Sequence, residues 1–129
     1  MSRFLTLLAG LGAAAGLAAC GGGFYLGYDY SYDNTDPSVS LAVGSTTVHA
    51  GDVLHVSAAA ADDNGIDSVA FYRYDGGSVV LLGSDGRAPY DLDLTVPSDG
   101  RTVLTLFARA TDWNGNRADS TPVSVNVLP

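Results

Sequence analysis

Residues 90–96 read Tyr-Asp-Leu-Asp-Leu-Thr-Val, and this stretch decides the fold class. Apolar and polar residues alternate at every step, so an extended chain places all the apolar side chains on one side. Such alternation is typical of a β-strand with one face on a hydrophobic core and the other in water. The inward set is Tyr90, Leu92, Leu94 and Val96, and the outward set is Asp91, Asp93 and Thr95.

Six further short runs lie on either side of this stretch, most of them with the same alternation. Turn pairs such as Asp75-Gly76 and Asp99-Gly100 separate several of them, and no stretch after Cys20 has a helical period. Seven runs with regular turn signals predict an all-β, antiparallel β-sandwich of about seven strands. Its domain begins at Pro37 and extends over residues 37–129. The six further runs cover residues 39–43, 53–61, 69–74, 79–82, 102–111 and 123–127.

The charged residues are of two types only, since all fourteen acids are Asp and all six bases are Arg. Asp favours turns over helix interiors, whereas Glu and Lys are common on helix surfaces. The absence of Glu and Lys therefore also indicates a protein of strands and turns. After residue 19, five Arg stand against fourteen Asp, a net charge of −9. This charge opposes nucleic acid and anionic lipid as direct partners, and it permits cation binding.

The first nineteen residues have the pattern of an export signal. Arg3 is followed by sixteen residues, Phe4 to Ala19, without an ionisable side chain. The run is short for a transmembrane helix, which needs roughly 20 apolar residues. It ends in Leu17-Ala18-Ala19-Cys20, and Cys20 is the single cysteine of the chain.

This tetrapeptide resembles the lipobox of bacterial lipoproteins. The resemblance implies cleavage before Cys20 and attachment of lipid to its sulfur, so the protein would be held on a membrane with its domain outside the cytosol. Two or more acyl chains hold a protein durably on a bilayer. Gly21 stands where an inner-membrane lipoprotein often has Asp, which favours an outer-membrane location if the cell has two membranes.

Residues 20–36 are expected to form a flexible tether. Gly21 to Gly23 lead into residues 24–36, in which four Tyr alternate with Gly, Asp and Ser. Such low-complexity runs usually serve as spacers. The alternative is an adhesive segment whose aromatic side chains lie at the lipid interface or bind a partner.

The rest of the chain resembles the bacterial immunoglobulin-like domains found in secreted glycosidases and surface adhesins. The matching segments are Ala60–Gly65, Val69–Tyr72, Ala88–Tyr90 and Ala108–Gly115. The resemblance implies a spacer, a stalk or a module that binds a protein or a glycan of the cell envelope.

Two similar loops provide candidate metal ligands. Residues 61–65 and residues 111–116 both contain Asp, Asn and Gly, and a sandwich of this type places both loops at one end. Ca²⁺ takes six to eight oxygen ligands, so a calcium-binding surface or adhesion module is the alternative function. Asp and Asn before Gly also form turns for purely local reasons. The candidate ligands are Asp62, Asp63, Asp67, Asp112, Asn114 and Asn116.

A candidate binding face lies on the third, sixth and seventh runs, which are expected to share one sheet. Tyr and Arg are enriched at interface hot spots, although cross-strand pairing alone also explains such a cluster. Trp113 is expected to cover the end of the sandwich or to offer a stacking platform. The residues of this face are Tyr72, Tyr74, Phe107 and Arg109, with Trp113 beside them.

Catalytic residues are not apparent. His55 lies outward on a strand, His49 lies in a turn before it, and neither belongs to a Ser–His–Asp or tight metal-ligand pattern. Asp91 and Asp93 share one strand face, but they read as a solvated surface. The sequence therefore predicts a lipid-anchored, non-catalytic envelope protein without a cofactor, calcium being the one candidate.

Overall fold

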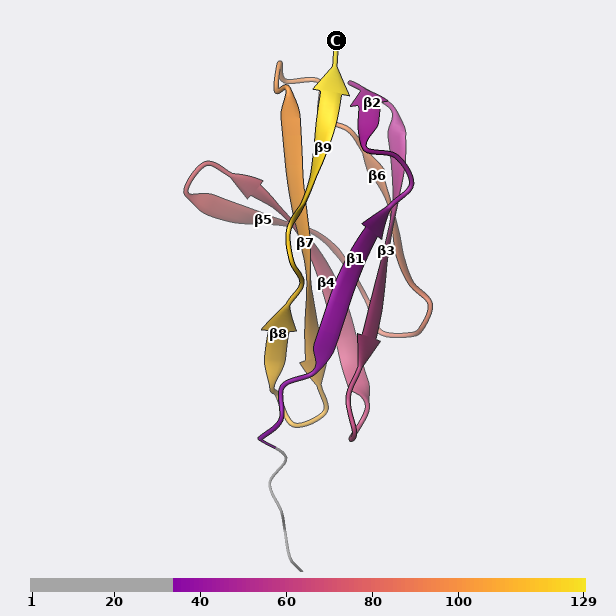
Figure 1. Ribbon diagram of the computed structural model, residues 1–129, viewed down its shortest axis with the longest axis vertical. Helices are drawn as coiled ribbons and strands as arrows, with labels where there is room; N and C mark the ends of the chain where they lie inside the picture. Colours follow the sequence, from indigo (N-terminus) through magenta and orange to yellow (C-terminus); the bar gives the residue numbers. More distant parts are fainter. Residues whose placement is uncertain (1–33) are drawn as a thin grey trace, which may run out of the picture. The chain divides into compact units, whose positions relative to one another are not determined.

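The computed structural model describes residues 34–129, which form two β-sheets (Figure 1). The smaller sheet has three strands in the order β1-β3-β6, and the larger has the order β2-β9-β7-β4-β5 with β8 also paired to β7. The strands of the smaller sheet are β1 (Ser38–Val43), β3 (Val53–Ala61) and β6 (Tyr90–Thr95); those of the larger are β2 (Thr47–His49), β4 (Ile66–Asp75), β5 (Ser78–Asp85), β7 (Val103–Asp112), β8 (Arg117–Asp119) and β9 (Val123–Leu128).

The all-β class is confirmed, with nine strands rather than seven in the described part of the chain. The two additional strands, β2 and β8, have three residues each. Three residues are too few to show a period of two. The partner of β2 is also distant in the chain, whereas β8 forms a short hairpin with the strand before it. β2 pairs in parallel with β9, whereas β8 pairs antiparallel with β7.

The core lies between the two sheets and is built from the inward side of each alternating run. On β7 the inward residues from Leu104 to Ala110 are at most 1% exposed. Leu94 and Val96 of the alternating stretch over residues 90–96 are also buried, and Leu92 is packed against the core. The alternation therefore predicts the core side of these strands correctly, because only one parity faces the opposite sheet.

The two ends of the described chain lie at opposite ends of the sandwich. β1 begins near the loops after β3 and β7, and Pro129 follows β9 at the other end (Figure 1). Parallel pairing joins β2 to β9 near that C-terminal end, with Thr47 opposite Asn126 and His49 opposite Leu128. Within residues 34–129, no helix is long and apolar enough to cross a membrane.

Candidate functional site

The predicted sheet for the binding face is confirmed, since β4, β7 and β9 are neighbours in the larger sheet. Tyr72 of β4 stands directly opposite Phe107 of β7. Their rings are stacked, with centroids 5.1 Å apart, and the Tyr74 ring lies 5.0 Å from the same Phe107 ring. The structure therefore brings the predicted aromatic residues together.

Phe107 does not form part of the exposed surface, contrary to the prediction. It points away from the core between the sheets, yet its side chain is only 2% exposed. Tyr72 and Tyr74 cover it, and the Arg109 guanidinium carbon lies 5.7 Å from its ring centroid. Phe107 thus serves as the buried base of the cluster rather than as a contact residue.

Arg109 has its charge paired on the sheet. Its Nε donates to Asp119 Oδ1 at 2.7 Å and its Nη2 donates to Asp119 Oδ2 at 3.1 Å. The hydrogen bonds to Asp119 are the main reason why the pKa of Arg109 lies above its ordinary value. Its guanidinium also lies 5.2 Å from the Tyr72 ring centroid. Strand β8 therefore supplies the acid that neutralises Arg109, and the cluster carries no net positive charge there.

The exposed part of the surface includes two aliphatic residues that the sequence analysis did not single out. Leu81 stands opposite Tyr72, and Val79 stands opposite Tyr74, so all four side chains share one side of the β4–β5 pair. The exposed fractions are 58% for Leu81, 46% for Val79 and 41% for Tyr74. We call Tyr72, Tyr74, Val79 and Leu81 the aromatic face.

A group of four alternating charges supports the hairpin that carries this face. Asp75 accepts hydrogen bonds from Arg73 and from Arg101, and Arg101 also donates to Asp99 at 2.9 Å. Arg73 is the main cause of the lowered pKa of Asp75, and Arg101 lowers the pKa of Asp99 to about 2. This quartet joins the β4–β5 hairpin to the loop before β7.

The two Asp/Asn-Gly loops have the same construction. In each, an Asp carboxylate accepts the backbone N–H of the Asn two residues later, at 3.1 Å from Asn64 to Asp62 and 2.9 Å from Asn114 to Asp112. In each, a Gly N–H donates to the carbonyl of the same Asp at 3.1 Å. Gly65 and Gly115 both have positive φ, at 93° and 86°, which favours glycine.

The Asp112 carboxylate is occupied by its own loop. It is 1% exposed, and its Oδ1 also accepts the Asn116 N–H at 2.8 Å while its Oδ2 accepts from Asn116 Nδ2 at 3.0 Å. Asp63 is exposed in the other turn, and Asp67 lies where the β4–β7 register shifts. Within residues 34–129, no group of three or more His, Cys or Asp side chains is placed to hold a metal ion. The calcium site stays a prediction.

Trp113 belongs to the loop pair rather than to the aromatic face. It is 68% exposed in the β7–β8 loop, and a Cβ added at Gly65 would lie 3.1 Å from its indole ring. The indole therefore lies directly against the turn between β3 and β4.

The predicted lipidation site, Cys20, lies outside the described residues.

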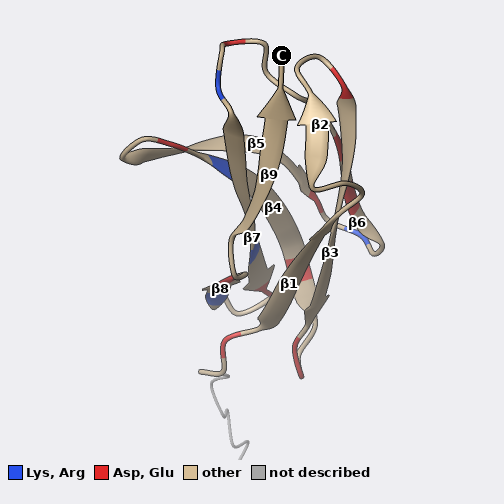
Figure 2. Ribbon diagram, turned by 45° about the horizontal axis from the view of Figure 1, so that its top comes forward, with Lys and Arg blue, Asp and Glu red and all other residues tan. Residues whose placement is uncertain are grey.

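The smaller sheet carries a separate charged cluster on its outer side. His55 Nδ1 lies 2.9 Å from Asp93 Oδ1, and His55 Nε2 lies 3.5 Å from Asp91 Oδ1. The hydrogen bond to Asp93 is the main reason why the pKa of His55 is raised. Both carboxylates lie on β6, so this edge of the sandwich is acidic (Figure 2).

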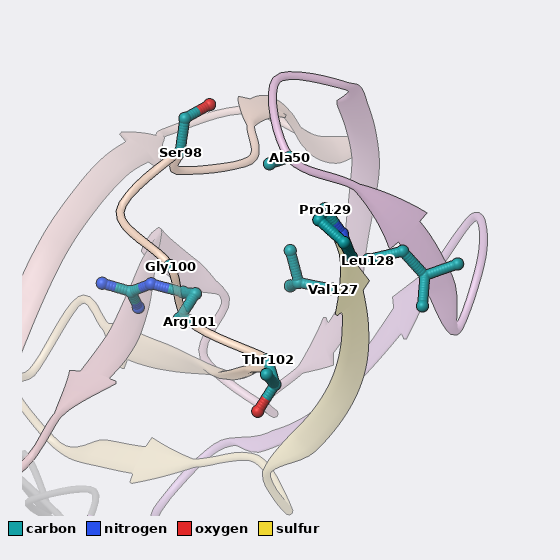
Figure 3. A pocket seen from close by; sticks show the side chains of 8 residues that line it. All are labelled: Ala50, Ser98, Gly100, Arg101, Thr102, Val127, Leu128 and Pro129. Carbon is teal, nitrogen blue, oxygen red and sulfur yellow. The ribbon is translucent and has the colours of Figure 1, made fainter.

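A shallow groove of about 390 Å³ lies at the C-terminal end of the sandwich (Figure 3). Val127, Leu128 and Pro129 form one side, and the loop before β7 forms the other. The guanidinium of Arg101 is directed away from these residues and is held by Asp99 and Asp75. The β9 side of the groove therefore consists of apolar side chains, whereas the loop before β7 adds Ser98 and Thr102 to the lining.

Comparison with known proteins assigns the domain. The family model described as "Bacterial Ig domain" matches residues 37–106. The chain belongs to this family. Bacterial Ig domains are typically extracellular or surface-exposed modules with structural or binding roles, and they are typically non-catalytic.

Solved structures support the fold of this Ig domain. The fibronectin(III)-like modules of Clostridium thermocellum CbhA are 28% identical with a TM-score of 0.57, over 70% of this chain and 94% of theirs. A chain from a structure on T-cell specificity and activation by the bacterial superantigen toxic shock syndrome toxin-1 is 14% identical with a TM-score of 0.55, over 71% and 99%. Among curated proteins no match is found.

Proposed function

We propose that this chain is a lipid-anchored envelope protein whose Ig domain binds another envelope protein through the aromatic face. The observation that carries the proposal is the contiguous exposure of Tyr74, Val79 and Leu81 on adjacent, hydrogen-bonded strands. Scattered exposed apolar residues are ordinary, whereas a cluster of this kind is typical of an interaction site.

The chemistry of the face favours a protein over a glycan. Sugars stack on exposed aromatic planes, but Tyr72 is half-buried on Phe107 and the most exposed side chain is aliphatic Leu81. Arg109 is neutralised by Asp119, so the face offers apolar contact rather than a free charge. A partner with a matching apolar strand or loop fits this surface.

Site-specific photo-crosslinking in intact cells tests the binding role. A photoreactive phenylalanine analogue at Leu81 is expected to capture a discrete partner, and the same analogue at Val53, which is 67% exposed on β3, is expected to capture none. Tyr74→Ser with Leu81→Ser should abolish capture by a probe at Val79, whereas Val53→Ser should not. Equal capture in all these variants would contradict the proposal.

The anchor is supported by the tetrapeptide that ends at Cys20, which lies outside the described residues. Mass spectrometry of the N-terminal peptide is expected to show a diacylglyceryl thioether on Cys20 and the loss of residues 1–19. Cys20→Ser should move the protein from the membrane fraction. An unmodified thiol on soluble material would contradict the anchor without affecting the binding proposal.

A further inference from the structure

Strand β5 forms one edge of the larger sheet. The strand order β2-β9-β7-β4-β5 ends there, and within residues 34–129 no strand pairs with the outer side of β5. An edge strand presents a row of backbone N–H and C=O groups that another strand can pair with. The edge is therefore a backbone-binding surface, separate from the side chains of the aromatic face.

The usual protection of such an edge is weak here. From Ser78 to Ser84 the strand contains no charged residue and no proline. The edge strand β6 of the smaller sheet, in contrast, carries Asp91 and Asp93 (Figure 2). One irregularity is present in β5, because the pairing with β4 steps over Leu82. Residues 78–81 remain a regular strand segment.

The first two residues of this segment, Ser78 and Val79, extend beyond the support of the rest of the sheet. Pairing of β4 with β7 reaches Arg73, whereas pairing of β4 with β5 continues to Asp75 opposite Ser78. The outer part of the hairpin is thus a two-stranded ribbon that projects from the sandwich (Figure 1). An isolated two-stranded ribbon is marginal in water, and a third strand stabilises it.

We propose that β5 pairs with β5 of a second copy of this chain, antiparallel and about a two-fold axis. Two-fold pairing satisfies both edges at once, and it is the commonest form of self-association. The chain carries a net charge of −8, but this charge does not prevent the pairing of two β5 strands. Residues 78–84 are uncharged, and the charges nearby are balanced, since Arg73, Arg101 and Arg109 are each paired with Asp. Val79 and Leu81 of the two copies become neighbours on the outer side of a continuous sheet.

Sedimentation equilibrium of the detergent-solubilised full chain tests the proposal. The density of the solvent is matched to that of the detergent, so that bound detergent does not affect the measured mass. The pairing segment is short, so we expect a reversible dimer with a dissociation constant in the range of about 1–100 μM. Val79→Lys places like charges near each other across the axis and should weaken the dimer at least about tenfold. Val53→Lys, at a valine on β3 that is 67% exposed against 46% for Val79, should leave the dimer unchanged. A monomer at all concentrations, or equal loss in both variants, would overturn the proposal.

Cysteine scanning provides a second measurement that does not depend on weakening the fold. Single cysteines at residues 78, 79, 80 and 81, oxidised in the membrane, are expected to give disulfide-linked chains with one maximum along the strand, where the axis crosses. The unsubstituted chain reports any linkage through Cys20, and Val53→Cys reports random collision. Linkage at residues 78–81 no greater than in these two controls would contradict the pairing. A conjugate of two identical chains also differs in mass from capture of a different partner.

Discussion

Asp112 combines deep burial with a complete set of hydrogen-bond donors. Three N–H groups of its own loop donate to its two oxygens, two from the backbone and one from the Asn116 side chain. Its position could have been found in the sequence, because it continues the inward row of β7 by one more step after Ala110. The sequence pattern does not reveal the donors, since they depend on how the chain turns back into β8.

Replacement of Asp112 by alanine is expected to destabilise the fold. The part-buried hydrogen bonds from Asn114 and Asn116 to this carboxylate would be lost. Hydrogen bonds to a charged group contribute about 1.5–3 kcal/mol, and each kcal/mol lowers the melting temperature of a domain of this size by roughly 4–8 °C. Asp112→Asn should cost less, because one amide oxygen still accepts the two backbone N–H groups. Thermal denaturation followed by circular dichroism measures both variants, and an unchanged midpoint in Asp112→Ala would contradict this role.

The same measurement decides between the turn and the calcium site. A ligand that binds only the folded state raises its melting midpoint. Wild-type protein with equal midpoints in EDTA and in millimolar Ca²⁺ would leave the carboxylates of Asp62 and Asp112 with their turn-forming role alone. A higher midpoint in Ca²⁺ would support the alternative function.

At the scale of strands, β4 and β7 determine which side chains reach the surface. Alternation predicts that Tyr72 and Phe107 lie on the outer side, which is correct, but it does not say what covers them. The side chains of Tyr72 and Tyr74 bury the Phe107 ring. This burial depends on the strand register, which places Tyr72 directly opposite Phe107. Val79 and Leu81 were missed because residues 79–82 read Val-Val-Leu-Leu, without alternation, and the shift at Leu82 sets their parity.

Phe107→Ala is expected to destabilise the domain as much as a core truncation. Removal of a buried phenylalanine ring typically costs about 3–5 kcal/mol. Thr105→Ala is the matched control on the same side of the same strand, where the loss of one hydrogen bond to Ser124 costs about 1 kcal/mol. Urea denaturation compares the two. Equal, small effects would mean that Phe107 is covered less completely than its contacts indicate.

The pair of strands β3 and β6 should give the domain a pH-dependent stability near neutrality. The pKa of His55 is raised in the folded state, mainly by its hydrogen bond to Asp93. Protonated His55 therefore stabilises the folded state. This stabilisation is complete below the unfolded pKa of about 6.5, and it is lost as the pH rises through the pKa of the folded state. The stability of the domain should therefore decrease as the pH rises above about 6.5, and the decrease should be smaller at high salt.

His55→Gln is the control for this dependence. The variant keeps a polar side chain on the exposed face of β3 but cannot become charged. Its denaturation midpoint should vary less with pH in the neutral range than that of the wild type, because the glutamine side chain cannot gain or lose a proton beside Asp93. An identical pH profile for both proteins would contradict the proposed contribution of His55.

At the scale of the whole molecule, the ion quartet ties the projecting hairpin to the rest of the domain. Most of the architecture could be predicted from the sequence, because alternation and turn residues identify seven runs and their inward sides. The short strand β2 and the quartet could not, since each joins residues far apart in the chain, as when Arg101 reaches Asp75. Strand β8 was missed because its three residues are too few to show alternation.

Acid is expected to loosen this hairpin. The pKa values of Asp75 and Asp99 are lowered, the latter to about 2, by Arg73 and Arg101 respectively. Their contribution is present above the unfolded value of about 3.8 and is lost as the pH falls through the folded pKa. Amide exchange in residues 74–80 should therefore accelerate between about pH 4 and pH 2 relative to β7.

Arg101→Met separates this effect from general acid unfolding. It keeps an unbranched side chain in the loop before β7 but removes the charge shared by Asp75 and Asp99. Exchange in the hairpin should already be fast in this variant near neutral pH, with β7 still protected. Unchanged hairpin exchange in the variant would show that the quartet does not hold the hairpin.

The placement of the two ends of the described chain has a mechanical consequence. A force that pulls them apart draws β1 and then β2 toward one end, while it draws β9 toward the other (Figure 1). Because β2 and β9 run parallel, their hydrogen bonds from Thr47 to His49 lie across the load and must break together, not one after another as in unzipping. The domain is therefore arranged to resist stretching along its length.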